Sequence, residues 1–201
     1  MISPLPVAPV IDPPAPRAIR LPDGQPALLR LIRSEDEAIL GTYFERLGAQ
    51  TRRLYAPHPF DRPTAAALCG AIDHAEAMRF LLTRPTGQGE EVVAYFIVKR
   101  GTYEGDRQRY AARGIALEEA TTCSLAPSVA DEWQSRGVGS VVLDAVLAAV
   151  RGLGFRRMIL QGGVRAENPR GIRFYEKNGF VRVGDFRVRD LDNHDMILTA
   201  R

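Results

Sequence analysis

The stretch Gln134-Ser135-Arg136-Gly137-Val138-Gly139 separates a β-type segment, residues 121–129, from an apolar segment of helical period, residues 138–153. Two glycines one residue apart let the backbone pass close to a ligand. A helix that begins there directs its unpaired N–H groups and the positive end of its dipole at an anion. The stretch therefore predicts a loop that binds a phosphate or pyrophosphate group.

The segments around this loop predict a βαβ unit. Residues 156–161 form a second apolar strand, and the helix at 138–153 connects it to the strand at 121–129. Such a connection is right-handed and makes the two strands parallel. We expect a ligand at the carboxyl ends of these strands.

The chain then predicts one more helix, over residues 169–177. Asn168 can cap this helix, and Pro169 loses nothing at its first position because that N–H has no helical partner. Asn178-Gly179 can end it by supplying a left-handed residue. Two strands follow, at 181–189 and 194–199.

The first half of the chain predicts a strand, two helices and an antiparallel hairpin. The expected elements are a strand at 27–32, helices at 34–47 and 63–72, and strands at 78–83 and 92–99 joined by a proline- and glycine-containing turn. The polar segment 101–118 shows no clean period, and we expect a mobile excursion there. Together these elements predict a mixed α/β fold.

Composition narrows the class of protein. A chain of 201 residues suits a single domain, and its net charge of +3 fits an anionic cofactor without indicating a nucleic-acid partner. No segment approaches the roughly 20 apolar residues of a membrane span, so we expect a cytoplasmic protein.

Cys69 and Cys123 are expected as reduced, buried thiols. His58, His74 and His194 are scattered, so no metal site is expected.

The N-terminus is rich in proline. Eight of the 14 prolines fall within the first 26 residues, and proline favours extended, polyproline-like backbone. We expect residues 1–24 to form a tail that precedes a domain at 25–201. The alternative is an arm that lies along the domain or along a partner subunit, which leaves a homodimer open.

Two motifs together resemble the GNAT-type N-acetyltransferases. Gln134-x-x-Gly137-x-Gly139 is similar to that family's Q/R-x-x-G-x-G/A loop. Asn168 and the segment Arg173-Phe174-Tyr175-Glu176-Lys177-Asn178-Gly179-Phe180 are similar to its downstream asparagine and FYEKNGF segment, in the same order and spacing. The resemblance covers residues of about 27–200, and residues 129–134 are similar to bacterial protein lysine acetyltransferase domains.

The resemblance implies a fold, a cofactor and a reaction. The implied fold is a central, mostly antiparallel sheet that is splayed at one parallel strand pair and flanked by helices. The implied reaction is transfer of an acetyl group from acetyl-CoA to a primary amine of a small molecule or a protein lysine. Tyr175 corresponds to the family's general acid. The residues implied in binding coenzyme A are Val129, Gln134, Ser135, Arg136, Gly137, Val138, Gly139, Ser140, Asn168 and Tyr175.

Plainer explanations exist for the same residues. Gly137 and Gly139 could only permit a tight turn, Asn168 could only cap a helix, and Tyr175 could be a core aromatic. We expect acceptor selection to come from residues 46–60, from 101–118 and from the last hairpin.

Two positions depart from the family pattern. Lysine acetyltransferases that use a glutamate base carry it near Cys123 or Ser124, where this chain has no carboxylate. Glu119 lies about 13 Å upstream on an extended strand, so the base is unassigned. Pro127 stands where the family's strand amide reaches the thioester, and proline has no N–H to give. The developing oxyanion must then be stabilised by another amide or a side chain, or the strand bulges and shifts register, or acetyl transfer is impaired. The plainer explanation is a bulge or an unpaired edge where the two strands separate.

These departures keep a second function open. A domain that binds acyl-CoA with little or no turnover could regulate a protein partner through its proline-rich arm.

Overall fold

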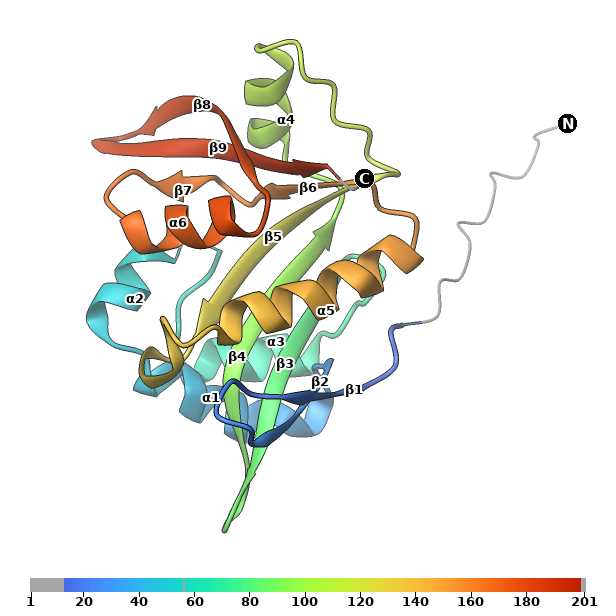
Figure 1. Ribbon diagram of the computed structural model, residues 1–201, viewed down its shortest axis with the longest axis vertical. Helices are drawn as coiled ribbons and strands as arrows, with labels where there is room; N and C mark the ends of the chain where they lie inside the picture. The colour runs from blue at the N-terminus through green and yellow to red at the C-terminus, as the bar shows by residue number, and fades with distance from the viewer. Residues whose placement is uncertain (1–12, 56, 200–201) are drawn as a thin grey trace, which may run out of the picture.

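A single sheet organises the computed structural model, which describes residues 13–55 and 57–199 (Figure 1). Its strands follow the order β1-β2-β3-β4-β5-β6-β9-β7, and β8 pairs with β9 outside this path. All pairs are antiparallel except β5 with β6. The strands are β1 (Arg17–Arg20), β2 (Pro26–Leu31), β3 (Ala77–Thr86), β4 (Gly89–Arg100), β5 (Thr122–Val129), β6 (Arg157–Leu160), β7 (Val164–Arg165), β8 (Val181–Val188) and β9 (Leu191–Thr199).

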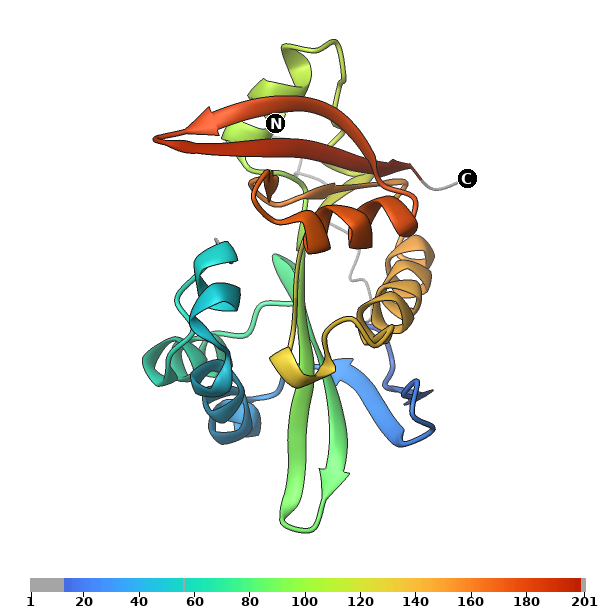
Figure 2. The same ribbon diagram turned by 60° about the vertical axis from the view of Figure 1, so that its left-hand side comes forward.

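Helices cover both faces of this sheet. Figure 2 shows α1, α2 and α3, in blue to teal, on one face and the orange α5 on the other. The helices are α1 (Glu37–Arg46), α2 (Ala49–Leu54), α3 (Arg62–Gly70), α4 (Glu104–Ala111), α5 (Val138–Gly152) and α6 (Pro169–Lys177). The predicted mixed α/β class and the βαβ unit formed by β5, α5 and β6 are confirmed. None of the described helices has both the length and the apolar character needed to span a membrane.

The parallel pair β5–β6 is short. It runs from Thr122 opposite Arg157 to Leu125 opposite Leu160, and the Gln161 amide donates to Leu125 O at 2.9 Å. Beyond Leu125, β5 stays paired with β4 as far as Val129. Over its last residues, after Leu125, β5 therefore has no strand partner on the β6 side. This opening between β5 and β6 is the predicted separation of the parallel strand pair.

Pro127 lies on that open edge. It pairs with Phe96 of β4 in continuous register, so no bulge is present. Leu125 directs its carbonyl at β6. Backbone groups two residues apart on a strand point to the same side, so the nitrogen of Pro127 also faces the β6 side, but at a level that β6 no longer reaches. A proline at this position therefore removes no hydrogen bond between strands. Of the explanations considered for Pro127, the unpaired strand edge is correct.

The predicted boundary between tail and domain is wrong. Part of the expected tail 1–24 is strand β1, which pairs with β2; Ile19 within the strand and Leu21 just after it are buried. The sequence hid this strand because prolines surround it. Residues 1–12, the rest of the expected tail, lie outside the described residues.

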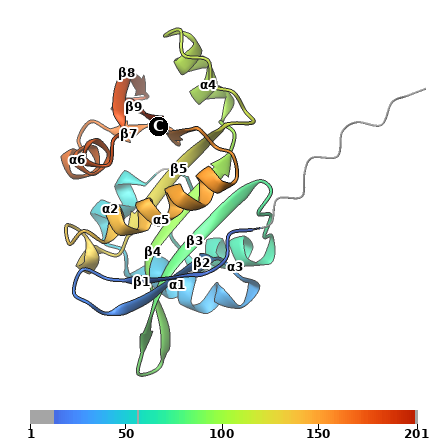
Figure 3. The ribbon, with the colours of Figure 1, turned by 45° about the vertical axis from the view of Figure 1, so that its right-hand side comes forward.

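The expected mobile excursion 101–118 contains α4. Figure 3 shows this helix beside the β8–β9 hairpin. Arg109 and Arg113 reach Asp195 of β9 at 3.0 and 2.8 Å, and the Asp195 side chain is completely buried. The arginines that made the segment look solvated are thus the groups that fix it to the sheet.

A second buried ion pair stabilises the N-terminal half. Arg30 of β2 donates to both carboxylate oxygens of Asp36, at 2.6 and 2.7 Å, and both side chains are almost fully buried. Asp36 also accepts from the Arg33 amide at 2.7 Å.

We predict that Asp36→Ala lowers the free energy of unfolding by about 3 kcal/mol, because it leaves the Arg30 charge buried without its main partner. Glu35→Ala is the matched control, since this neighbouring carboxylate is exposed, and it should change stability by less than about 0.5 kcal/mol. Urea unfolding of both variants measures the difference. Equal stabilities would contradict the role given to the pair.

Candidate functional site

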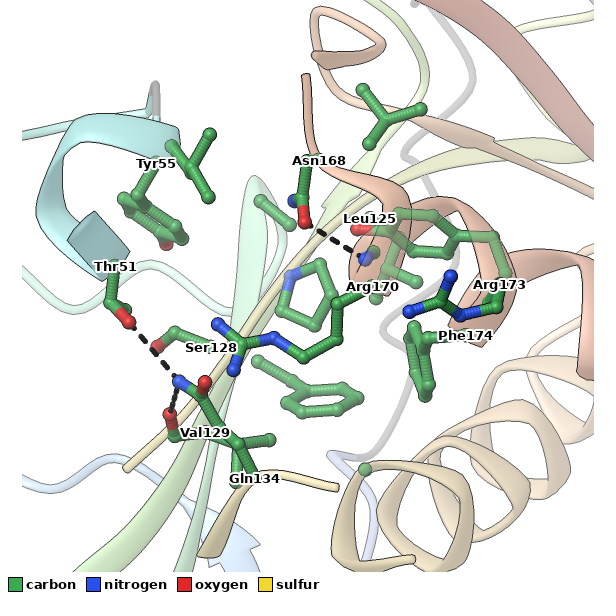
Figure 4. A pocket seen from close by; sticks show the side chains of 18 of the residues that line it. Thr51, Tyr55, Leu125, Ser128, Val129, Gln134, Asn168, Arg170, Arg173 and Phe174 are labelled. Carbon is green, nitrogen blue, oxygen red and sulfur yellow. Dashed lines mark hydrogen bonds between the residues drawn. The ribbon is translucent and has the colours of Figure 1, made fainter. Parts of the chain in front are cut away.

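A cavity of about 410 Å³ occupies the opening at the end of β5. Its walls come from the end of β5, the loop before α5, the start and inner face of α6, and α2 with the residues after it (Figure 4). The α5 and α6 side and the α2 side lie on opposite faces of the sheet. The cavity therefore passes through the sheet where the strands separate.

The loop before α5 has the backbone of an anion cradle. Ser135 and Gly137 adopt left-handed φ values of 60° and 83°, and Gly137 is the residue that caps α5. No backbone carbonyl of the described residues accepts from the amides of residues 136–139. The Ser140 amide is already engaged by Gly137 O at 3.1 Å. The free amides thus end at Gly139, and the Ser140 amide, which the family resemblance also implied in binding coenzyme A, is not free.

Gln134 connects three walls of the cavity. Its side-chain nitrogen lies 2.8 Å from Val129 O, 3.1 Å from Thr51 Oγ1 and 3.0 Å from Asp131 Oδ1 (Figure 4). Its Oε1 atom is buried without a partner among the described residues. Gln134 therefore fixes the loop to the end of β5 and to α2 while keeping an acceptor free for a ligand.

Helix α6 presents Asn168 and Tyr175 to the cavity. Asn168 Oδ1 accepts from the Gly171 amide at 2.9 Å, as expected of a helix cap. Tyr175 is buried, and this burial raises the pKa of its hydroxyl well above the ordinary value. The hydroxyl consequently stays protonated throughout the physiological pH range.

Gly139 brings α5 and α6 together. A Cβ atom at this position would lie 3.0 Å from Phe174 Cε2, on the residue next to Tyr175. The second glycine of the loop therefore provides close helix packing, while the first provides the left-handed turn.

Most of the predicted site residues meet in this cavity, and two do not. Arg136 and Val138 are absent from the lining: the Arg136 guanidinium lies over the Trp133 ring, and Val138 is buried in the core. Their backbone amides have no backbone acceptor among the described residues. The residues that do line the cavity are Val129, Gln134, Ser135, Gly137, Gly139, Ser140, Asn168 and Tyr175.

Three cations of α6 were missed by the sequence reasoning. Arg170, Arg173 and Lys177 line the cavity, and none forms an ion pair with any described residue. In Figure 4 the Arg170 side chain reaches across the cavity toward Gln134. Their i, i+3, i+7 spacing places them on one helical face and could have revealed them. Together with the start of α5 they make this side of the cavity positive.

The opposite wall is largely apolar and comes from α2. Thr51, Leu54, Tyr55 and Pro57 line it, so residues 46–60 contribute to the cavity as expected. The other two segments expected to select the acceptor, 101–118 and the last hairpin, contribute no lining residue.

Arg52 holds this wall in place. Its guanidinium donates to four main-chain carbonyls: Leu47 O, Phe60 O, Phe44 O and Glu45 O, at 2.6–2.7 Å. Besides Gln134 Oε1, two further polar atoms of lining residues, Tyr55 Oη and Gln161 Oε1, are buried without partners among the described residues.

A family model described as the acetyltransferase (GNAT) family matches residues 46–180. The chain belongs to the GNAT acetyltransferase family. The family expected from the two motifs is thereby confirmed, and the match spans both of them. No curated protein matches the chain.

Solved GNAT structures share this fold. The GNAT domain of PAT from S. lividans is 20% identical with a TM-score of 0.70, over 94% of this chain and 99% of that one. The ribosomal-protein-S5-alanine acetyltransferase of Vibrio fischeri is 14% identical with a TM-score of 0.65, over 86% and 92%. The yncA protein of Salmonella typhimurium, solved with its cofactor acetyl-CoA, is 16% identical with a TM-score of 0.60, over 86% and 93%.

We predict that Arg52→Ala lowers the free energy of unfolding by about 2 kcal/mol, because it removes the charged donor from several partly buried carbonyls. Arg53→Ala is the control, since Arg53 makes only an exposed pair with Glu167 and should cost less than about 1 kcal/mol. Thermal and urea unfolding of both variants provide the comparison. An Arg52 variant as stable as the Arg53 variant would show that α2 is held by other contacts.

Proposed function

We propose that this GNAT protein transfers an acetyl group from acetyl-CoA to a primary amine on a small molecule or a protein. One observation carries the proposal: an open anion cradle and a splayed strand edge meet in a single cavity that crosses the sheet. Family membership supports the same reaction.

The residues present fit coenzyme A. The free amides of 136–139 and the cations Arg170, Arg173 and Lys177 suit its phosphates. The unpaired edge of β5 suits the amide-bearing pantetheine arm, and the unpartnered Gln134 Oε1 offers it an acceptor. When bound, acetyl-CoA supplies the activated acetyl group as a thioester.

The protein's own contribution is to position the amine and to move a proton. Tyr175 would donate to the departing thiolate, since its hydroxyl stays protonated and faces the cavity. Pro127 offers no N–H on the open edge. Because backbone groups two residues apart on a strand point to the same side, the next β5 amide that faces this open edge belongs to Val129.

A second function is favoured by two observations at the β5 strand. Cys123 is completely buried, and Ser124 Oγ donates to Gly101 O at 2.9 Å, so neither is placed to act as a base. Glu119 pairs with Arg107 instead of facing the cavity. An acyl-CoA-binding regulatory domain would need no base. Release of free thiol from acetyl-CoA in the presence of amines separates the two functions.

For the cofactor site, we predict that Gly137→Val weakens coenzyme A binding at least about tenfold, because a β-branched residue is strained at a left-handed φ and disturbs the free amides. Gly154→Val is the matched control: Gly154 has a similar φ of 91°, open space around it and no place in the cavity lining. Calorimetric titration with coenzyme A measures both. Equal affinities would remove the phosphates from this loop.

For the reaction, we predict that Tyr175→Phe lowers kcat about 100-fold while the affinity for acetyl-CoA changes less than about twofold, because only the proton donor is lost. Single-turnover rates and binding titrations measure the two effects. Wild-type activity should show no loss from Tyr175 ionisation up to pH 9, since burial keeps its pKa raised. Unchanged single-turnover rates in the variant would exclude Tyr175 as the acid.

A further inference from the structure

The described residues that line the cavity provide no group that could deprotonate an ammonium. Among the described residues that line it, none is Asp, Glu or His. Its titratable side chains are Tyr55 of α2 and Tyr175 of α6, together with the cations Arg170, Arg173 and Lys177 of α6. Burial raises the pKa of both tyrosines, so they remain neutral.

Two groups that could act as a base or relay a proton near the cavity, His58 and Ser128, already form hydrogen bonds within the protein. His58 contacts the Tyr55 ring from behind, but its Nδ1 bonds to Pro59 O at 2.7 Å and its Nε2 to Tyr95 Oη at 3.3 Å. Burial also lowers the pKa of His58. Ser128, which lines the same wall, bonds to Tyr43 Oη at 2.9 Å, and burial raises the pKa of that tyrosine.

Two carboxylates close in sequence to lining residues, Asp131 and Glu167, are engaged by other groups as well. Asp131 accepts from the Gly48 amide at 2.5 Å and from Gln134 at 3.0 Å. Glu167, adjacent to Asn168, pairs with Arg53 of α2 at 3.4 Å. Neither lines the cavity.

The proton balance of acetyl transfer decides what such a cavity can accept. When a neutral amine attacks the thioester, a C–N bond forms, the C–S bond breaks, nitrogen loses one proton and sulfur gains one. Tyr175 can hand its proton to sulfur and recover one from nitrogen, directly or through water, so no further base is needed. An ammonium carries one proton more, and a group outside this cavity would have to remove it first.

The cavity also offers a neutral amine suitable partners. Tyr55 and Gln161 line the cavity with uncharged side chains, and their Oη and Oε1 atoms are buried without a partner among the described residues. After a side-chain rotation that turns them into the cavity, these atoms would accept from an N–H without requiring charge. Leu54, Tyr55 and Pro57 make the surrounding wall apolar. A cation would meet three positive side chains and no carboxylate on the lining.

We infer that, if the protein is the acetyltransferase proposed above, its acceptor is a weakly basic amine that enters uncharged: an α-amino group next to a carbonyl, as in an amino-acid amide or a peptide N-terminus with an apolar side chain. Lysine side chains and polycationic amines are poor acceptors. At pH 7.5 roughly a third of an α-amine with a pKa near 7.7–8.0 is neutral, whereas only about one in a thousand molecules of an alkylamine with a pKa near 10.4 is.

Matched amine pairs test this inference. Leucinamide and isopentylamine differ only in the carboxamide that lowers the basicity of the amine, and phenylalaninamide and phenethylamine form a second pair. Thiol release from acetyl-CoA is measured from pH 6.5 to 9.5 with the full-length protein. At pH 7.5 we expect kcat/KM to be about 10- to 100-fold higher for the amides. For the alkylamines it should rise about tenfold per pH unit up to pH 9, whereas for the amides it should level off near pH 8.

The outcomes separate this inference from the proposed function. Alkylamines that match or exceed the amides at pH 7.5, with kcat/KM independent of pH, would show that a base exists and would overturn the inference while leaving acetyl transfer intact. Coenzyme A binding without thiol release for any of the four amines at any pH would overturn acetyl transfer itself.

Two variants locate the groups concerned. Glu167→Gln removes a carboxylate next to the lining residue Asn168 whose ion-pair partner is the exposed Arg53. We expect the pH profile of each amine to be unchanged. A flattened amide profile together with a large loss of kcat would make Glu167 the base and contradict the inference. Tyr55→Phe should raise KM for leucinamide about three- to tenfold with acetyl-CoA affinity unchanged, and an unchanged KM would remove Tyr55 from the acceptor site.

Discussion

The early end of the β5–β6 ladder is the constraint on which the site depends. Parallel strands that stayed paired to their ends would fill the sheet and leave no passage through it. Here the last bond joins Gln161 to Leu125, while β4 continues to support β5 as far as Val129. The end of β5 is therefore held by β4 on one side and has no strand partner on the other. A proline can occupy it at no cost, and the loop and helix that follow β5 start directly beside it.

The sequence predicted the cofactor half of the molecule well, because its signals are local. The Gly137 turn, the Asn168 cap and the Gly179 stop each depend on neighbouring residues, and the structure places them as expected. Predictions failed where distant contacts decide the local structure. Strand β1 exists because it pairs with β2, and α4 is ordered by Asp195, which is 82 residues from Arg113. No window of sequence around either segment contains that information.

The two walls of the cavity differ in how they could be recognised. The cations of α6 follow a helical spacing and were within reach of sequence reasoning. The α2 wall has no comparable pattern: the hydroxyl of Tyr55 becomes important only because the fold buries it without a partner, and Arg52 matters because four carbonyls converge on it. The acceptor side is thus defined by tertiary geometry, and its lack of acidic groups is visible only once the lining is known.

The contact between Gly139 and Phe174 joins two motifs that are 35 positions apart. A single methyl group at residue 139 would lie 3.0 Å from the Phe174 ring, next to Tyr175 in the middle of α6, so this ring would have to shift. The phosphate loop and the tyrosine are therefore one packing unit, and substitutions in one would have to be matched in the other. The α2 wall contacts the cofactor side through polar side chains such as Gln134 and Arg53, while Arg52 and the packing of Tyr55 on Phe60 hold it to its own side of the sheet, so it can vary separately. This arrangement would allow new acceptors to be acquired by changing residues 49–60 while the cofactor side stays fixed.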